Sequence, residues 1–229
     1  MKPRLLDLFC CAGGASWGYH MAGFDVVGVD IAKQTRYPLP FIRADVLDMD
    51  PRFLATFDII HASPPCQFAT LLKHAPGGKK HPNLIPATRA LLKKAGRPYI
   101  IENVEPAAPH LINPVMLCGS MFGLEAEGCQ LRRHRYFETS FHLAPPCGCQ
   151  HSDGPVIGVY GGHARKRSAK HGGRGTKDVW KGGHISAASE AMEMSWASLA
   201  ELSEAIPPAY THHIGLAALT HLATVRRAA

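Results

Sequence analysis

The chain has 229 residues, of which 46% are hydrophobic and 19% are charged, so its composition predicts one folded catalytic domain and excludes an intrinsically disordered chain. The formal net charge of +7 is compatible with a polyanionic partner but does not identify one. The apolar start of the chain is interrupted by Asp7 and ends in glycines, and no later stretch is long enough to span a bilayer, which predicts a cytoplasmic protein with no membrane partner.

Short apolar runs alternate with helix-like stretches in the first half of the chain. This alternation predicts an α/β domain with a mostly parallel sheet. The two runs at 58–62 and 99–103 are almost continuously apolar up to their last positions, which is typical of strands buried on both faces. Ligands bind at the carboxyl edge of such sheets. The expected strands are 4–9, 26–30, 41–46, 58–62 and 99–103, and the expected helices are 15–22 and 82–95.

The composition changes between residues 142 and 183, where glycine, histidine, lysine and arginine replace most aliphatic residues. This segment is predicted to form loops or a small excursion from the core. Helices are expected at 186–196, at 198–205 and after Pro207. We therefore divide the chain into a catalytic and cofactor-binding core (1–140), a short variable insert (141–184) and C-terminal helices that return to the core (185–229).

The segment LLDLFCCAGGASWGY predicts a strand, a glycine turn and a helix. Gly13 and Gly14 would let the backbone approach a ligand closely, and the free amides of the helix start suit a carboxylate. Asp30 ends the next strand, where an acidic side chain can accept hydrogen bonds from ribose hydroxyls, and Asp45 is similarly placed for an adenine amino group. An ordinary tight turn and ordinary capping carboxylates remain the alternatives.

Two further motifs follow buried strands. In HASPPCQ, two prolines stiffen the loop that presents Cys66 at the carboxyl edge of the sheet, where cationic neighbours can activate a thiol. In IIENV, Glu102 would be held in a poorly solvated place that raises its pKa and lets it donate a proton at neutral pH. A buried structural cysteine and a glutamate in an ion pair are the alternatives.

DLFCCAGG, SPPCQ and ENV, in that order, resemble the cofactor loop, nucleophile loop and acid motif of the C5-cytosine DNA methyltransferase family. LCGSMFGL, LRRHRYFE and ELSEAIPPAYTHHIG resemble the segments that follow in that family. The resemblance implies a Rossmann-like S-adenosylmethionine-dependent methyltransferase fold. It also implies transfer of a methyl group to C5 of a cytosine that is flipped out of double-stranded DNA.

The resemblance also implies a role for each matched residue. Cys66 would attack C6 of the base, Glu102 would protonate or hydrogen-bond N3, and the pair Arg133 and Arg135 would hold the flipped nucleotide. Leu131 stands where the family usually has glutamine, with Gln130 one place away. The residues that would bind S-adenosylmethionine are Phe9, Gly13, Gly14, Asp30, Asp45 and Pro65.

The segment between the arginine motif and the last motif is much shorter than the target-recognition domain of conventional family members. Residues 142–183 are therefore predicted to be a minimal DNA-contacting insert, and a disordered, solvated loop is the alternative. The short chain suggests a compact, monomeric, phage-type or orphan enzyme in a bacterial or phage-infected cell, with a separate restriction nuclease as an open question. The residues expected to contact DNA are Gln67, Arg165, Lys166, Arg167, Lys170 and Arg174.

The seven cysteines favour reduced thiols over a disulfide framework, because the chain shows no export signal. PPCGCQH offers Cys147, Cys149 and His151 as zinc ligands, with His142 as a fourth. A CxC pair is not the usual CxxC knuckle, and no second cysteine pair follows. We therefore expect no metal and keep zinc as the alternative.

Three other functions remain open at this point. A few relatives in this family modify transfer RNA, so the same chemistry on RNA is the nearest alternative. A catalytically silent DNA-binding relative would be expected to lose Cys66 or Glu102, and both are present. Transfer of a modified group from an altered sulfonium cofactor is the third.

Overall fold

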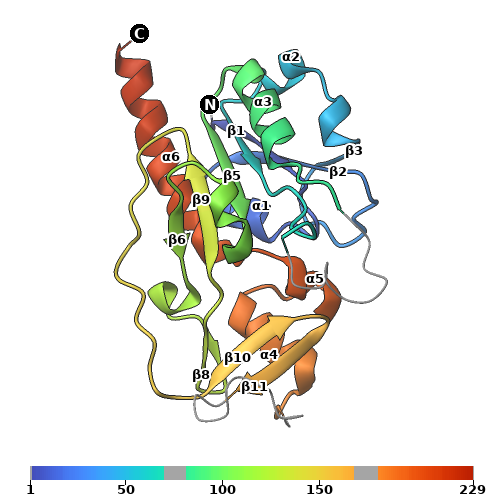
Figure 1. Cartoon of the computed structure of the whole chain (residues 1–229), viewed down its shortest axis with the longest axis vertical. Coiled ribbons are helices and arrows are strands. Elements are labelled where there is room, and N and C mark those ends of the chain that lie inside the picture. Colours follow the sequence, from blue (N-terminus) through green and yellow to red (C-terminus); the bar gives the residue numbers. More distant parts are fainter. Residues whose placement is uncertain (1, 70–80, 168–179, 229) are drawn as a thin grey trace.

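The computed structural model describes residues 2–69, 81–167 and 180–228. Its main element is a seven-stranded sheet with the order β3-β2-β1-β4-β5-β9-β6 (Figure 1). The first five strands in this order are parallel, whereas β9 runs antiparallel to both of its neighbours. The predicted α/β fold with a mostly parallel sheet is confirmed. The strands are β1 (Arg4–Leu8), β2 (Asp25–Asp30), β3 (Phe41–Arg43), β4 (Ile59–Ala62), β5 (Tyr99–Asn103), β6 (Val115–Leu117) and β9 (Arg135–Thr139).

Side chains alternate between the two faces of this sheet, and each face is covered by helices. In β1, Leu5 belongs to the core under one helix layer, and Leu6 and Leu8 belong to the core under the other. The first layer contains α1 (Gly14–Ala22) and α6 (Pro208–Ala228), and the second contains α2 (Pro51–Leu54) and α3 (Ile85–Ala95). A Cβ at Gly18 would lie 2.1 Å from the Pro208 carbonyl oxygen, so glycine is needed for the close contact of α1 with α6.

A smaller four-stranded sheet, with the order β11-β10-β8-β7, forms a second lobe with α4 and α5 (Figure 1). Strands β7 and β8 precede residue 140, whereas β10 and β11 follow it. The predicted division of the chain into a core, an insert and C-terminal helices stays a prediction. Among the described residues, no helix is both long enough and apolar enough to cross a membrane. The elements of this lobe are β7 (Glu125–Ala126), β8 (Cys129–Leu131), β10 (Val156–Tyr160), β11 (His163–Arg167), α4 (Gly183–Met192) and α5 (Leu199–Glu204), and short 3-10 turns occur at Val46–Asp48, Glu105–His110 and Gly119–Phe122.

The expectation of loops for residues 142–183 is wrong for one part of that segment. Strands β10 and β11 form an antiparallel hairpin that turns at Gly161 and Gly162, whose positive φ angles glycine adopts without strain. Ile157 and Val159 are buried in the core of the lobe. Only one face of the hairpin is apolar, so basic and glycine residues dominated the composition and concealed the period-2 pattern.

Candidate functional site

A cavity of about 1200 Å³ lies between the two sheets. One wall is formed by the loops that leave the carboxyl ends of β1, β2, β4 and β5. The other wall is formed by β10, by the connection from β8 to β9 and by residues 203–206. Parallel strands that end at the same edge bring together side chains far apart in sequence, and the expected site lies at this edge.

The glycine motif forms a tight turn between β1 and α1 at the cavity. Phe9 and Cys11 both have positive φ angles, 60° and 45°, and Gly13 follows at 84°. A Cβ at Gly13 would lie 2.8 Å from the Tyr37 ring, and one at Gly14 would lie 2.3 Å from the Ile206 carbonyl oxygen. Both positions therefore require glycine, because the neighbouring residues lie too close to leave room for a side chain. Helix α1 begins at the second glycine.

The C-terminal part of the chain contacts this turn. The Trp196 indole Nε1 donates to the Ala12 carbonyl at 2.8 Å, and residues 203–206 line the cavity. The wall beside the glycine turn thus depends on contacts across most of the sequence.

Asp30 and Asp45, which were both predicted to bind the cofactor, lie in different environments. Asp30 is the last residue of β2 and lines the cavity, and its carboxylate accepts hydrogen bonds from the amides of Cys11 (3.1 Å) and Ala32 (2.9 Å). Asp45 is exposed, caps a 3-10 turn by accepting from the Leu47 amide at 2.9 Å and does not line the cavity. The structure therefore supports Asp30 and gives Asp45 a capping role.

The remaining residues expected at a cofactor also lie on this wall. Phe9 and Pro65 line the cavity together with both glycines. The turn at Gly13 and Gly14 has no room for a Cβ, and the carboxylate of Asp30 is held beside it by hydrogen bonds. This arrangement fits the methionine and ribose parts of S-adenosylmethionine. The residues on this wall of the cavity are therefore compatible with that cofactor.

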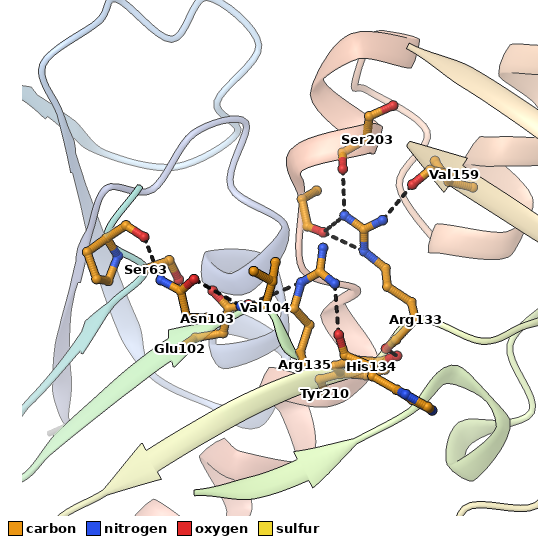
Figure 2. A network of polar contacts seen from close by, with 12 residues as sticks. Ser63, Glu102, Asn103, Val104, Arg133, His134, Arg135, Val159, Ser203 and Tyr210 are labelled. Atoms are coloured by element: carbon orange, nitrogen blue, oxygen red, sulfur yellow. Dashed lines mark hydrogen bonds and ion pairs between the residues drawn. The ribbon is translucent and has the colours of Figure 1, made fainter. Parts of the chain in front are cut away.

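Cys66 lies on the same cavity in a loop held at several points. The amide of Ser63 donates to the Leu8 carbonyl at 3.1 Å, and the Asn103 side chain donates to the Pro64 carbonyl at 2.8 Å (Figure 2). The thiol is half-buried, and burial raises its pKa. The carboxylate of Glu102 raises the pKa further, whereas the Arg135 guanidinium lowers it.

Glu102 is the fourth residue of β5 and is only 6% exposed. Burial raises its pKa, and the charge of Arg135, whose Nε lies 3.1 Å from Oε1, acts in the opposite direction. The expected poorly solvated carboxyl group is present. The ion pair that was the alternative interpretation is present too, with Arg135 as the partner, so the two interpretations are not exclusive.

Behind Glu102 lies a buried hydrogen-bonded chain that sequence reasoning missed. The Tyr19 hydroxyl lies 2.9 Å from His61 Nδ1, and His61 Nε2 lies 2.8 Å from the Ser63 hydroxyl, which hydrogen-bonds Glu102. Burial lowers the pKa of His61 to about 3, so the imidazole is neutral. All groups are satisfied when Tyr19 donates to Nδ1, Nε2 donates to Ser63 and Ser63 donates to Glu102. A histidine inside an apolar strand was the only sequence signal.

Arg133 and Arg135, which were predicted to act together, have different contacts (Figure 2). Arg135 points to Glu102, whereas the buried Arg133 guanidinium donates to the carbonyls of Val159 (2.6 Å), Ser203 (2.7 Å) and Ala205 (2.8 Å). Burial lowers the pKa of Arg133 to about 9. In this arrangement Arg133 joins the two lobes, and its donors are occupied by the protein.

The predicted DNA-contacting residues are also separated. Gly158 pairs with Arg165 across the hairpin, and Ile157 pairs with Lys166. Because Ile157 is buried, Lys166 lies on the inner face, where its ammonium lies 6.0 Å from the centre of the Trp180 ring. Arg165 shares the other face with Gly158, which lines the cavity. Exposed Gln67 also lines the cavity, whereas the side chain of Arg167 and the whole of Lys170 and Arg174 lie outside the described residues.

The two residues near the unmatched glutamine position have structural contacts. Leu131 is buried, and the Gln130 side chain donates to the Gln150 carbonyl at 3.1 Å and accepts from Arg132 at 3.1 Å. Gln130 thus fixes the segment around residue 150 and is not among the cavity-lining residues.

The predicted zinc ligands only partly come together. Cys149 Sγ and His151 Nε2 lie 3.1 Å apart. Cys147 is exposed, and its sulfur lies 3.8 Å from the Met121 carbonyl. His142 is exposed and is not among the described side chains that gather around Cys149. The alternative set of Cys147, Cys149, His151 and His142 therefore does not come together around one point in the structure.

No protein-family model and no curated protein matches the chain. Among solved structures, a prophage-encoded E. coli protein described as a DNA modification methyltransferase is 20% identical over 59% of this chain and 45% of that chain, with a TM-score of 0.45. The S. pombe Dnmt2 methyltransferase is 15% identical over 63% and 52% of the two chains, with a TM-score of 0.43. The present chain thus spans about half the length of these two proteins. The Entamoeba histolytica methyltransferase EhMeth is 9% identical over 97% of this chain and 99% of that chain, with a TM-score of 0.63, which shows that the two chains share a fold.

Proposed function

We propose that this protein transfers a methyl group from S-adenosylmethionine to C5 of cytosine in DNA. The observation that carries the proposal is one cavity in which the half-buried thiol of Cys66 and the buried carboxyl group of Glu102 lie beside the glycine turn. A methyltransferase fold alone would not require a cysteine and a glutamate at the ends of neighbouring strands.

C5 of cytosine is a poor nucleophile until a group adds to C6. Cys66 is suited to this addition, because a thiolate is strongly nucleophilic and can later leave. Burial opposes thiolate formation, so the thiol needs the favourable charge of Arg135 to lose its proton. The sulfur–C6 bond forms as the ring electrons move toward N3.

Glu102 supplies the acid for this step. Its raised pKa favours the protonated carboxyl group, which can donate to N3 as negative charge develops there. S-adenosylmethionine, when bound, would supply the methyl group from its sulfonium: the bond from sulfur to methyl would break as the bond from C5 to methyl forms, and a neutral thioether would leave. C5 would then lose its proton to water, and the electrons of that C–H bond would re-form the C5–C6 double bond as the Cys66 thiolate leaves.

A cytosine must leave the base stack to enter the cavity, and the chain offers basic and polar groups at its walls. Arg135 lines the cavity, Gln67 lies next to the nucleophile, and Arg165 lies on the face of the hairpin that carries the cavity-lining Gly158. Arg133 contributes by holding the second lobe against the first. We propose double-stranded DNA as the substrate on the basis of the motif resemblance and the net charge of +7.

Transfer of tritium from labelled S-adenosylmethionine to unmethylated genomic DNA tests the proposal. We expect label in 5-methylcytosine with the wild-type protein and none with Cys66→Ser. Cys147→Ser is the matched control, because this thiol is exposed and lies outside the cavity, and it should label DNA at the wild-type rate.

The same assay separates the alternatives. Label on RNA but not on DNA of matched sequence would identify an RNA methyltransferase. Absence of label from both, with intact DNA binding, would identify a silent relative. Mass spectrometry of the product base would show whether the group transferred is an unmodified methyl.

A further inference from the structure

Four side chains that are distant in sequence meet beside the β8–β9 connection. They are Cys118, His134, Cys149 and His151, and their candidate ligand atoms all lie within 4.8 Å of one another. Cys118 follows β6, His134 precedes β9, and the other two lie in the segment before β10. None of them takes part in the proposed reaction.

The distances between these atoms are close to those of a tetrahedral metal site. His134 Nε2 and His151 Nε2 lie 3.4 Å apart, and the sulfur-to-nitrogen distances are 3.4 Å (Cys118 to His151), 3.6 Å (Cys149 to His134) and 3.1 Å (Cys149 to His151). Zinc bonds of about 2.3 Å to sulfur and about 2.0 Å to nitrogen at tetrahedral angles would place such atoms about 3.3 to 3.6 Å apart.

The surroundings of the four groups also suit a metal. The Ser120 hydroxyl donates to Cys118 Sγ at 3.2 Å, and a Glu105 oxygen lies 3.9 Å from His134 Nδ1, the ring nitrogen that faces away from the cluster. Hydrogen bonding to a thiolate and a carboxylate behind a histidine are typical of the outer shell of zinc sites. The two imidazole rings are stacked, with 5.3 Å between centroids.

We propose that Cys118, His134, Cys149 and His151 bind one zinc ion. Four protein ligands leave no open position, so the site is structural and not catalytic. The expectation of no metal came from local spacing, which pairs Cys149 with Cys147, whereas the tertiary structure pairs it with Cys118.

The position of the site gives zinc a specific task. His134 lies between Arg133 and Arg135, and Figure 2 shows its side chain pointing away from both arginine side chains. Arg135 Nη1 donates to the His134 carbonyl at 2.8 Å. Zinc would therefore fix the connection and the start of β9, which present Arg133 to the second lobe and Arg135 to Glu102, and would join them to the segment before β10.

Zinc content and affinity of the full-length protein test the site. Wild type, Cys149→Ser, His151→Ala and Cys147→Ser are purified without chelator, their zinc is measured by mass spectrometry, and affinity is measured by competition with a chromogenic chelator. Cys147→Ser is the matched control, because its sulfur is two residues from Cys149 but outside the cluster. His151 is exposed, so replacing it leaves no cavity in the core.

We expect one zinc per chain in wild type and Cys147→Ser, and at least about tenfold weaker binding in the two ligand variants. Added zinc should raise the unfolding temperature of wild type and Cys147→Ser but not that of the two ligand variants. Cobalt should give a thiolate charge-transfer band that Cys149→Ser weakens. A wild-type protein that neither contains nor takes up zinc, or ligand variants that bind as Cys147→Ser does, would overturn the proposal. These readouts do not depend on methyl transfer.

Discussion

The two walls of the cavity are built in different ways. The first wall consists of loops at the ends of β1, β4 and β5, and each loop is a short motif whose residues are neighbours in sequence. The second wall combines β10, residues 203–206 and the β8–β9 connection, which are joined by Arg133. The first wall carries the groups proposed for chemistry, and the second determines the shape of the space that faces them.

This difference predicts that substitutions in the two walls have different effects. A change to a reactive group in the first wall should affect rate more than stability, because the strand below it is packed independently of that group. A change to Arg133 should affect stability, because three carbonyl groups lose their donor together.

Among substitutions that keep Cys66, Glu102→Gln is expected to have the largest effect on rate. The amide keeps the shape of the side chain but cannot donate the proton, so kcat should fall by about 10²- to 10⁴-fold. Single-turnover methyl transfer measures this, and thermal unfolding should show that the variant is folded. A rate within a factor of about two of wild type would rule out Glu102 as the acid.

The wild-type rate should also depend on pH through the same group. Burial raises the pKa of Glu102, and the protonated form is the active acid, so this contribution to the rate is lost as the pH rises through the raised pKa. The pH profile of single-turnover transfer measures the effect, and Glu102→Gln should lack this limb. An unchanged limb in the variant would assign the titration to another group.

Arg133→Met tests the second wall. It removes the donor from two buried carbonyls and one partly buried carbonyl and should lower the free energy of unfolding by about 3 to 5 kcal/mol. Chemical denaturation measures this change. Arg97→Met is the control, because the more exposed Arg97 donates to one carbonyl, that of Ala55, at 2.8 Å. Equal effects of the two substitutions would contradict the role of Arg133 as the link between the lobes.

Asp7, in strand β1 below the first wall, should make the stability of the protein depend on pH. It is buried and accepts a hydrogen bond from Ser16, and burial raises its pKa to about 7. Between pH 4 and pH 7 the folded state holds a proton that the unfolded state has lost, so the free energy of unfolding should fall as pH rises, by roughly 4 kcal/mol in total. Denaturation across this range should show a flatter dependence for Asp7→Asn, and equal slopes would contradict the raised pKa.

The smallest expected effect concerns the hairpin. Arg165→Ala should weaken nucleic-acid binding several-fold and reduce the slope of log K against log salt by about 1, because one phosphate contact is lost. Lys166→Ala is the matched control, since its side chain lies on the opposite face beside Trp180. Fluorescence anisotropy at several salt concentrations measures both, and equal losses would show that charge alone, and not the face of the hairpin, determines binding.

The five parallel strands β1 to β5, the helices α1 and α3, the glycine turn and the positions of Cys66 and Glu102 after buried strands could be predicted from sequence. Each depends on local signals, such as continuous apolar strands, glycines at positive φ and polar residues at strand ends. A local signal can also have two meanings. Asp45 follows a strand as Asp30 does, but its carboxylate caps the following 3-10 turn and does not line the cavity.

What the sequence alone determined was the fold class and the residues proposed for the reaction, because motif chemistry is encoded within a few consecutive residues. Only the tertiary structure separated Arg133 from Arg135, placed Arg165 and Lys166 on opposite faces and brought Cys118 to Cys149. Those outcomes depend on strand register and on contacts between segments far apart in the chain. Neither is encoded in spacing, because the distance between two side chains across a sheet is independent of the number of residues that connect them.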